Sequence, residues 1–323
     1  MNNGLKNILL GCTTALTIVC VLVGTKMHIG GGVHFYSPFT AITEKLVNKV
    51  DDKIITHFGK KDHGSGEKDD NHTLGNNAKN VDVSFEEEIK ELRLDLDLGD
   101  VDIAMGGENR LVIHCGSEKL VPEYELKNGV LTVAHKSNKY INLFDDKEVK
   151  VSITVQDELE VLFAELDMGD LDVDGIVAKT IELDLDMGDM DITNVVTDSI
   201  SAKLAMGDGS VDKLVAADAD LDMSMGSMTV RNSVIQKGRV ENSMGDVNFE
   251  DVEFDNMKVE LSAGDMSLYL PFAKDECDIY ANVSAGDLSI DGKSVGNSYS
   301  SKGESRALNV SCDLGDISIE FAK

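Results

Sequence analysis

The sequence predicts an all-β protein, a single-stranded, right-handed parallel β-solenoid with 19-residue rungs. A phrase of the form apolar-x-apolar-x-apolar-Gly-Asp-apolar-x-apolar recurs nine times, and six consecutive copies are 19 residues apart. Such fixed periods are typical of repeat architectures, in which one unit cannot bury its own apolar face and must stack on its neighbours. The right hand is the general preference of parallel β crossovers. The glycines of the nine phrases are Gly99, Gly169, Gly188, Gly207, Gly226, Gly245, Gly264, Gly286 and Gly315.

The alternation within the phrase predicts a β-strand on each side of the glycine. The columns five residues before and four residues after the glycine are apolar in all nine copies. The columns three before and two after are apolar in eight, with Asn242 and Gly209 as the exceptions. Mostly Asp, Glu, Ser, Thr and Asn stand between them. A period of two gives each strand one buried face, so stacked rungs would enclose a core of aligned apolar columns.

The Gly-Asp pair predicts a bend between the two strands. Glycine tolerates positive φ, and aspartate can accept a hydrogen bond from the backbone that follows it. Gly226 departs from the rule because serine follows it. Methionine stands before the glycine in five copies, and we interpret this column as core that fills space beside the bend, although thioethers can also bind Cu(I). These residues are Met168, Met187, Met206, Met225 and Met244.

Residues 1–25 predict a transmembrane helix. The 18 residues from Ile8 to Thr25 carry no charge and are bounded by lysines, which is just enough to span a bilayer. A cleaved signal peptide and a lipoprotein are the alternatives. No Ala-x-Ala site follows, and only about four apolar residues precede the lipobox-like Leu9–Cys12. We therefore expect an uncleaved single-pass anchor in the cell membrane, with the C-terminal domain extracellular.

Residues 26–80 predict a juxtamembrane connector. Apolar residues recur at helical spacing from Ser37-Pro38 to about Phe58, which predicts an amphipathic helix. The polar, glycine-containing stretch 60–80 predicts a flexible linker. Five of the seven histidines lie in the connector. Their spacing matches no common metal-ligand pattern, so we interpret them as solvated residues.

Residues 81–323 are the predicted solenoid domain, with an irregular insert over about 106–160. Within the insert, Asn128-Gly129 between alternating runs predicts a hairpin, and residues 149–155 predict a further strand. We expect a short cap at Phe85–Glu91 before the first phrase.

Two loops are expected after the regular rungs, around Pro271–Asp275 and Gly292–Gly303. Nothing obvious caps the last strand, so an exposed end rung that pairs edge to edge with another copy is expected.

Charge and cysteine content exclude several classes of protein. The net charge of −29 divides into +2 over residues 1–80 and −31 over the remainder. A body this acidic does not bind nucleic acid, whose affinity depends on neutralising phosphates, but it attracts cations. Cys115, Cys277 and Cys312 are an odd number with no metal-like spacing, so no disulfide framework is expected. Cys312 falls in an inward column and is predicted to be buried.

Stacked aspartates make calcium the sharpest candidate ligand. Carboxylates about 4.8 Å apart repel by roughly 1–3.5 kcal/mol, and a divalent cation with a preference for oxygen would relieve that repulsion. The competing interpretation is that bend aspartates cap their bends while surface carboxylates splay or hold loose, non-specific Ca²⁺. No resident cofactor is expected. The candidate ligands are Asp167, Asp170, Asp172, Asp186, Asp189 and Asp191.

Outward columns change from aspartate to hydroxyl residues along the rod, and they form either a binding face or a merely solvated face. Carboxylate pairs could also hydrolyse polysaccharide, but every rung offers that distance. Substrate-binding aromatics and arginines are scarce, and no histidine lies in the repeats, so no enzyme is expected. The hydroxyl residues are Ser224, Ser243, Ser262 and Ser284 in one column and Ser210, Thr229, Ser267, Ser289 and Ser318 in the other.

The order of anchor, connector, early Gly-Asp phrase, hairpin-bearing insert and serial Gly-Asp strands resembles the bacterial putative-adhesin family of β-strand-repeat proteins, a domain of unknown function. The resemblance covers about residues 81–323. It implies the fold and brings no catalytic motif. The phrases that carry it are those at Gly169, Gly188, Gly207, Gly245, Gly264, Gly286 and Gly315.

The resemblance implies a non-catalytic, adhesin-like interaction surface at the cell envelope, with an unknown protein or an envelope or extracellular glycan as partner. The family is also similar to membrane-anchored accessory proteins encoded with envelope-stress regulators. An accessory or sensor protein of such a system is therefore the alternative.

Overall fold

The computed structural model describes residues 79–135 and 148–322, which belong to one compact unit. The predicted anchor 1–25, nearly all of the connector and the segment 136–147 lie outside the described residues. Within the described ranges, no helix is long and apolar enough to cross a membrane.

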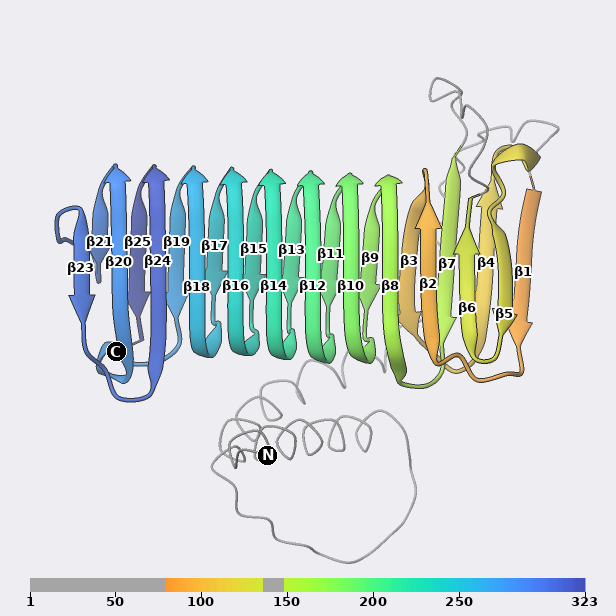
Figure 1. The fold of residues 1–323 in the computed structure, drawn as a ribbon, viewed down its shortest axis with the longest axis horizontal. Coiled ribbons are helices and arrows are strands. Elements are labelled where there is room, and N and C mark those ends of the chain that lie inside the picture. Colours follow the sequence, from red (N-terminus) through yellow and green to blue (C-terminus); the bar gives the residue numbers. More distant parts are fainter. Residues whose placement is uncertain (1–78, 136–147, 323) are drawn as a thin grey trace, which may run out of the picture. The chain divides into compact units, whose positions relative to one another are not determined.

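Each regular rung contributes one long and one short strand, and residue i pairs in parallel with residue i+19 of the next rung. Figure 1 shows the long strands side by side in one layer and the short strands in a second. We call these the long-strand sheet, with 12 strands, and the short-strand sheet, with 13. The long strands of the regular region are β8 (Leu159–Met168), β10 (Val177–Met187), β12 (Val196–Met206), β14 (Val215–Met225), β16 (Val234–Met244) and β18 (Glu253–Ala263). The short strands are β9 (Leu171–Asp174), β11 (Met190–Thr193), β13 (Gly209–Asp212), β15 (Met228–Arg231), β17 (Val247–Glu250) and β19 (Met266–Leu270).

The core lies between the two sheets and consists of the predicted apolar columns. All nine residues of the column five before the glycine and all nine of the column four after it are buried. Asn242 is also buried, and it is satisfied locally: its Nδ2 donates to the Gly226 carbonyl (2.9 Å), and its Oδ1 accepts from the Met244 N–H (3.1 Å). Cys312 is buried as predicted, and Cys115 and Cys277 are also buried free thiols.

The bend glycines are required by their conformation and by close packing. All nine have φ between +127° and +148°, a region that L residues with a side chain rarely adopt. The rungs also approach closely here. A Cβ on Gly207 would stand 1.8 Å from the Gly188 carbonyl oxygen.

A second bend in each regular rung lies six residues after the glycine, and it was not predicted from the sequence. Its residue adopts left-handed backbone with φ between +48° and +71°. The signal is the enrichment in Gly, Asn and Asp at one offset, since these types tolerate that region best. The residues are Gly175, Asn194, Lys213, Asn232 and Asp251.

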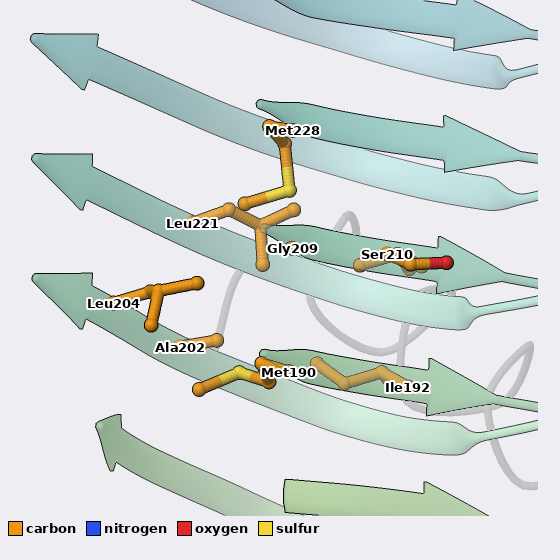
Figure 2. Close-up of a pocket in the computed structure, with 9 residues that line it drawn as sticks. Met190, Ile192, Ala202, Leu204, Gly209, Ser210, Leu221 and Met228 are labelled. Carbon is orange, nitrogen blue, oxygen red and sulfur yellow. The ribbon is translucent and has the colours of Figure 1, made fainter. Parts of the chain in front are cut away.

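Gly209 leaves a small gap in the core column that it interrupts. Figure 2 shows Met190 and Met228 beside this position, while the Ser210 side chain points away from the gap. The cavity is about 10 Å³, at the lower limit of what a water molecule needs. The flexible ends of Met223 and Met228 fill most of the missing volume, about 3 Å from where a Cβ of Gly209 would lie.

The chain does not stack its last two rungs in sequence order. The rung of Gly315 lies between the rungs of Gly264 and Gly286, because its strands pair with both neighbours. Short antiparallel strands then cover the far rung. The elements are η2 (Lys274–Glu276), β20 (Cys277–Ala285), β21 (Leu288–Ile290), β22 (Lys293–Ser294), β23 (Ser298–Ser301), β24 (Arg306–Leu314) and β25 (Ile317–Phe321).

The other end is built in the same way. The first phrase lies inside the stack, between the first regular rung and strands of the insert. Antiparallel strands β1 and β5 stand at the outer edges. The elements are β1 (Lys79–Phe85), β2 (Glu91–Leu96), β3 (Asp100–Met105), β4 (Asn109–Cys115), η1 (Glu118–Leu120), β5 (Glu123–Lys127), β6 (Val130–Ala134) and β7 (Val149–Val155).

These ends confirm some predictions and correct others. The hairpin at Asn128-Gly129 and the strand at 149–155 are confirmed. The cap expected at Phe85–Glu91 is wrong, because the capping strand β1 ends at Phe85. The loop expected at Gly292–Gly303 contains the cap strands β22 and β23. The C-terminal strand was expected at an exposed edge, but it is an interior strand.

Candidate binding surfaces

The bend aspartates form a hydrogen-bonded ladder along one edge of the solenoid. The Oδ1 of seven bend aspartates accepts from the backbone N–H of the equivalent residue one rung on, with the Asp189 N–H 2.9 Å from Asp170 Oδ1 and the Asp208 N–H 2.8 Å from Asp189 Oδ1. The prediction that each aspartate accepts a bond from the backbone that follows it is therefore wrong, because the bond comes from the next rung instead. The Ser227 N–H donates such a bond to Asp208 Oδ1 (2.8 Å). One oxygen of each of these carboxylates is committed to joining rungs.

The six candidate calcium ligands are divided among three surfaces. Asp167 and Asp186 lie on the outer face of the long-strand sheet, and Asp172 and Asp191 face each other in register on the outer face of the short-strand sheet. The remaining two, Asp170 and Asp189, belong to the bend ladder. Within residues 79–135 and 148–322, no group of three or more His, Cys, Asp or Glu side chains is arranged to hold a metal ion. Each surface offers a pair, and calcium at these pairs stays a prediction.

Both outward pairs lie in strongly acidic surroundings. Burial, followed by the charges of Asp97, Asp186 and Asp95, raises the pKa of Asp167. On the other sheet, the pKa of Asp172 is likewise raised by burial and by neighbouring carboxylates. Neighbouring carboxylates thus add to the effect of burial in both columns, while Lys150, which pairs with Asp102 (3.0 Å), acts in the opposite direction on Asp172.

The middle of the long-strand sheet has mixed charges instead. Arg239 bridges Asp220 (3.1 Å) and Glu241, and Lys258 pairs with Glu260. A hydrogen bond with Glu260 raises the pKa of Glu241. Pairs as exposed as these contribute little to stability, but they interrupt the acidic face. Toward the C-terminal rungs, serine and asparagine share this face with Asp278, Tyr280 and Asp313.

A shallow groove of about 200 Å³ crosses the short-strand sheet. It lies where the outward aspartate column changes to hydroxyl residues, and carboxylates, hydroxyls and one guanidinium line it. The sequence indicated the column change but not the hollow. The lining residues are Asp189, Asp191, Asp208, Gly209, Ser210, Ser227, Thr229 and Arg231.

The methionine column is a surface feature, and its interpretation as core was wrong. Met187, Met206, Met225 and Met244 are 41–58% exposed, and Met168 is half-buried. We call the four exposed residues the methionine ridge. They end consecutive long strands, at the arrowheads in Figure 1.

Strand alternation alone would point these side chains inward. Each strand ends at its methionine, however, and the chain turns there, so the side chain lies at the corner outside the two sheets. The same column holds Leu314, which is 61% exposed. The signal available in the sequence was position: a residue beside a bend glycine need not follow the alternation of the strand before it.

Comparison with solved structures returns bacterial proteins of low sequence identity. A putative lipid binding protein from Parabacteroides distasonis is 12% identical, with 77% of this chain and 98% of that chain covered and a TM-score of 0.49. Putative adhesins from Parabacteroides distasonis and Bacteroides fragilis are 14% and 13% identical, with 77% of this chain and 98% and 99% of theirs covered and TM-scores of 0.43 and 0.41. These neighbours assign no ligand to this chain. No curated protein matches it.

The family comparison confirms the resemblance drawn from the repeated phrases. The family model covers residues 89–320, from two residues before β2 to within the last strand, β25. It therefore includes the insert and both interior terminal rungs as well as the regular repeats. The chain belongs to the Toastrack DUF4097 family.

Proposed function

We propose that the protein is a non-catalytic, adhesin-like interaction protein of the cell envelope. In this proposal, residues 1–25 anchor the protein in the cell membrane as a single transmembrane helix. Residues 26–80 connect this anchor to the acidic solenoid of residues 81–323, which is extracellular. The coil is right-handed, as parallel crossovers generally are. The path of the chain in Figure 1 supports this hand.

The groove on the short-strand sheet is the observation that carries the proposal. Its carboxylates, hydroxyls and guanidinium can both accept and donate hydrogen bonds, which suits a ligand rich in hydroxyl groups. The rungs beneath are held by main-chain ladders and bend aspartates, so the groove is preorganised and little ordering cost attends binding. An envelope or extracellular glycan is therefore the favoured ligand class.

The repeated surface argues against catalysis. The same carboxylate spacing recurs on successive rungs, whereas general acid–base chemistry needs two groups whose environments separate their roles. Asp172 and Asp191 occupy equivalent positions on neighbouring strands, and the repeats contain no histidine.

Binding to isolated envelope polysaccharide tests the proposal. We expect the tagged full chain, in detergent, to bind wall polymer and the double variant Asp191→Asn with Arg231→Gln to bind at least tenfold more weakly. The matched control is Asp222→Asn with Lys237→Gln, which removes one acid and one base from the long-strand sheet. Equal binding by both variants would show that the groove is not the site that binds the polysaccharide.

A crosslinking pull-down from intact cells, with a tag at Lys323 and an anchor-only control, addresses the other partner class. Specific capture of membrane proteins without glycan enrichment would replace the adhesin-like role with the accessory role in envelope stress or signalling.

A further inference from the structure

We propose that the methionine ridge binds a soft monovalent metal ion, Cu(I), between the thioethers of adjacent rungs. The four side chains are in register on neighbouring strands, Met187 with Met206, Met206 with Met225 and Met225 with Met244. All four are exposed. Packing therefore does not explain why a flexible apolar residue recurs at this corner, and thioether sulfur is a ligand that selects Cu(I).

The spacing of the ridge suits such an ion. Neighbouring parallel strands lie about 4.8 Å apart, which is close to twice a metal–sulfur bond of about 2.3 Å, the length known for zinc and thiolate. An ion between two rungs can therefore contact a sulfur from each. The three rotatable bonds of methionine let a third sulfur approach. Four thioethers can hold one or two ions in this way.

The backbone beneath the ridge is fixed while the side chains remain free to adjust. The carbonyl of each methionine accepts from the bend glycine of the preceding rung, as Met206 does from Gly188 (3.0 Å) and Met244 does from Gly226 (2.9 Å). The Cα positions are thus preorganised, so binding has only side-chain rotamers to order.

The charges on either side favour a cation. Thioethers are neutral, so the bound ion keeps its positive charge. Asp186 precedes the first ridge methionine, and bend aspartates Asp189 and Asp208 follow the first and second. These carboxylates are hard ligands that suit Ca²⁺ or Mg²⁺, so they attract a soft ion electrostatically without replacing sulfur as its ligand.

The absence of a proton on the thioether gives the site a distinguishing property. Thiolate and imidazole ligands must lose protons to bind a metal, which makes their affinity depend on pH. Binding at the ridge is expected to persist at pH 5. The buried cysteines are poor competitors, since burial raises the pKa of Cys277 to about 11 and keeps it a thiol.

NMR of the full chain in detergent, labelled at the methionine methyl carbons, reads the site directly. Silver(I) nitrate in chloride-free buffer serves as a redox-inert stand-in for Cu(I). We expect the methyl signals of the four ridge residues to shift, with saturation at one or two ions per chain at pH 7 and at pH 5. Signals of the buried Met190, Met228, Met257 and Met266 are expected to stay in place.

Paired variants separate the thioether from the apolar surface. Met206→Leu with Met225→Leu preserves volume and hydrophobicity and is expected to weaken Cu(I) binding at least tenfold in competition with bicinchoninate. Met190→Leu with Met228→Leu, in the core, is expected to leave it unchanged. Absence of ridge shifts, shifts confined to buried methionines, or undiminished affinity in the ridge variant would each overturn the proposal. The last of these would place the metal at ligands outside the ridge.

Discussion

At the scale of single residues, two glycines of one rung serve different purposes. Gly207 has φ +144° and no room for a Cβ, whereas Gly209 lies in ordinary strand backbone beside the mobile ends of Met223 and Met228. A Gly207→Ala change therefore forces both backbone strain, of order 1–3 kcal/mol, and a clash with the Gly188 carbonyl.

We expect the Gly207→Ala change to lower the free energy of unfolding by about 3 kcal/mol or more. Gly209→Ala is expected to stay within about 1 kcal/mol of the parent. Urea unfolding followed by circular dichroism compares them, and equal losses would contradict this account.

The outward aspartates predict how the free energy of unfolding changes with pH. Because the folded-state pKa of Asp172 is raised, the folded protein binds its proton more tightly than the unfolded chain does. This contribution to stability is present at low pH and is lost as pH rises from about 4 through the raised pKa. Asp172→Asn is expected to stabilise the protein at pH 7 by about 0.5 kcal/mol, the scale of a like-charge cross-strand pair. The gain should vanish near pH 3.

Thermal unfolding of parent and variant at the two pH values measures this difference. Calcium at millimolar concentration adds a second comparison. If an ion binds at Asp172 and Asp191, it raises the melting temperature of the parent and not of the variant. A variant that is less stable than the parent at pH 7 would show that repulsion in this column is already relieved.

At the scale of one rung, Asn242 is the departure from the repeat that can be tested most cleanly. It occupies a column otherwise filled by apolar residues, and its in-register neighbour on the next strand is Leu261. Asn242→Leu removes two hydrogen bonds of about 0.5–1.5 kcal/mol each and buries a side chain that contributes about 1.5–3 kcal/mol. The two contributions nearly cancel, so we expect a free energy of unfolding within about 1 kcal/mol of the parent in urea unfolding. The mirror change, Leu261→Asn, should cost about 3 kcal/mol, and a loss of stability in both would mean that the asparagine is required for its bend.

How far the sequence predicts an element depends on whether its cause is local. Strands, bend glycines and the hairpin at Asn128-Gly129 follow from spacing and residue type over a few positions. The second bend was missed because Lys213 breaks its Gly, Asn and Asp signature. The methionine ridge was misassigned because strand alternation was extended one residue into a corner. The groove could not be foreseen, since it depends on the relative sizes of side chains from three rungs.

At the scale of the whole molecule, the order of the rungs is the part that no local pattern reveals. The phrases at Gly286 and Gly315 are equivalent in sequence, and either could follow Gly264. Packing around the crossing decides between them. Arg306, at the start of β24, lies 4.6 Å from the centre of the Phe272 ring and 3.4 Å from Glu253. Phe272 also packs edge-on against Phe254 in β18. Arg306 and Phe272, which lies in the loop after β19, thus link β24 to β18.

The interior position of the C-terminal rung leads to a contrast between two deletions of nearly equal size. Ending the chain after Ser305 removes 18 residues and both strands of that rung. Among the described residues, these two strands, β24 and β25, are what joins β20 and β21 to the stack. Deleting residues 208–226 removes one whole regular rung and leaves the caps and the register intact. Repeat stacks behave as sums of units and nearest-neighbour interfaces.

We therefore expect the internal deletion to remain monomeric and to unfold cooperatively, with a free energy of unfolding slightly below that of the parent. The C-terminal deletion should expose the edges of β18 and β19 and aggregate. Size-exclusion chromatography and urea unfolding of the two full-length-derived variants decide the matter. A monomeric, cooperatively folded C-terminal deletion would contradict this expectation. It would mean that β20 and β21 can pair with β18 and β19 in place of the deleted strands. The contacts of Arg306 and Phe272 would then contribute nothing to the order of the rungs.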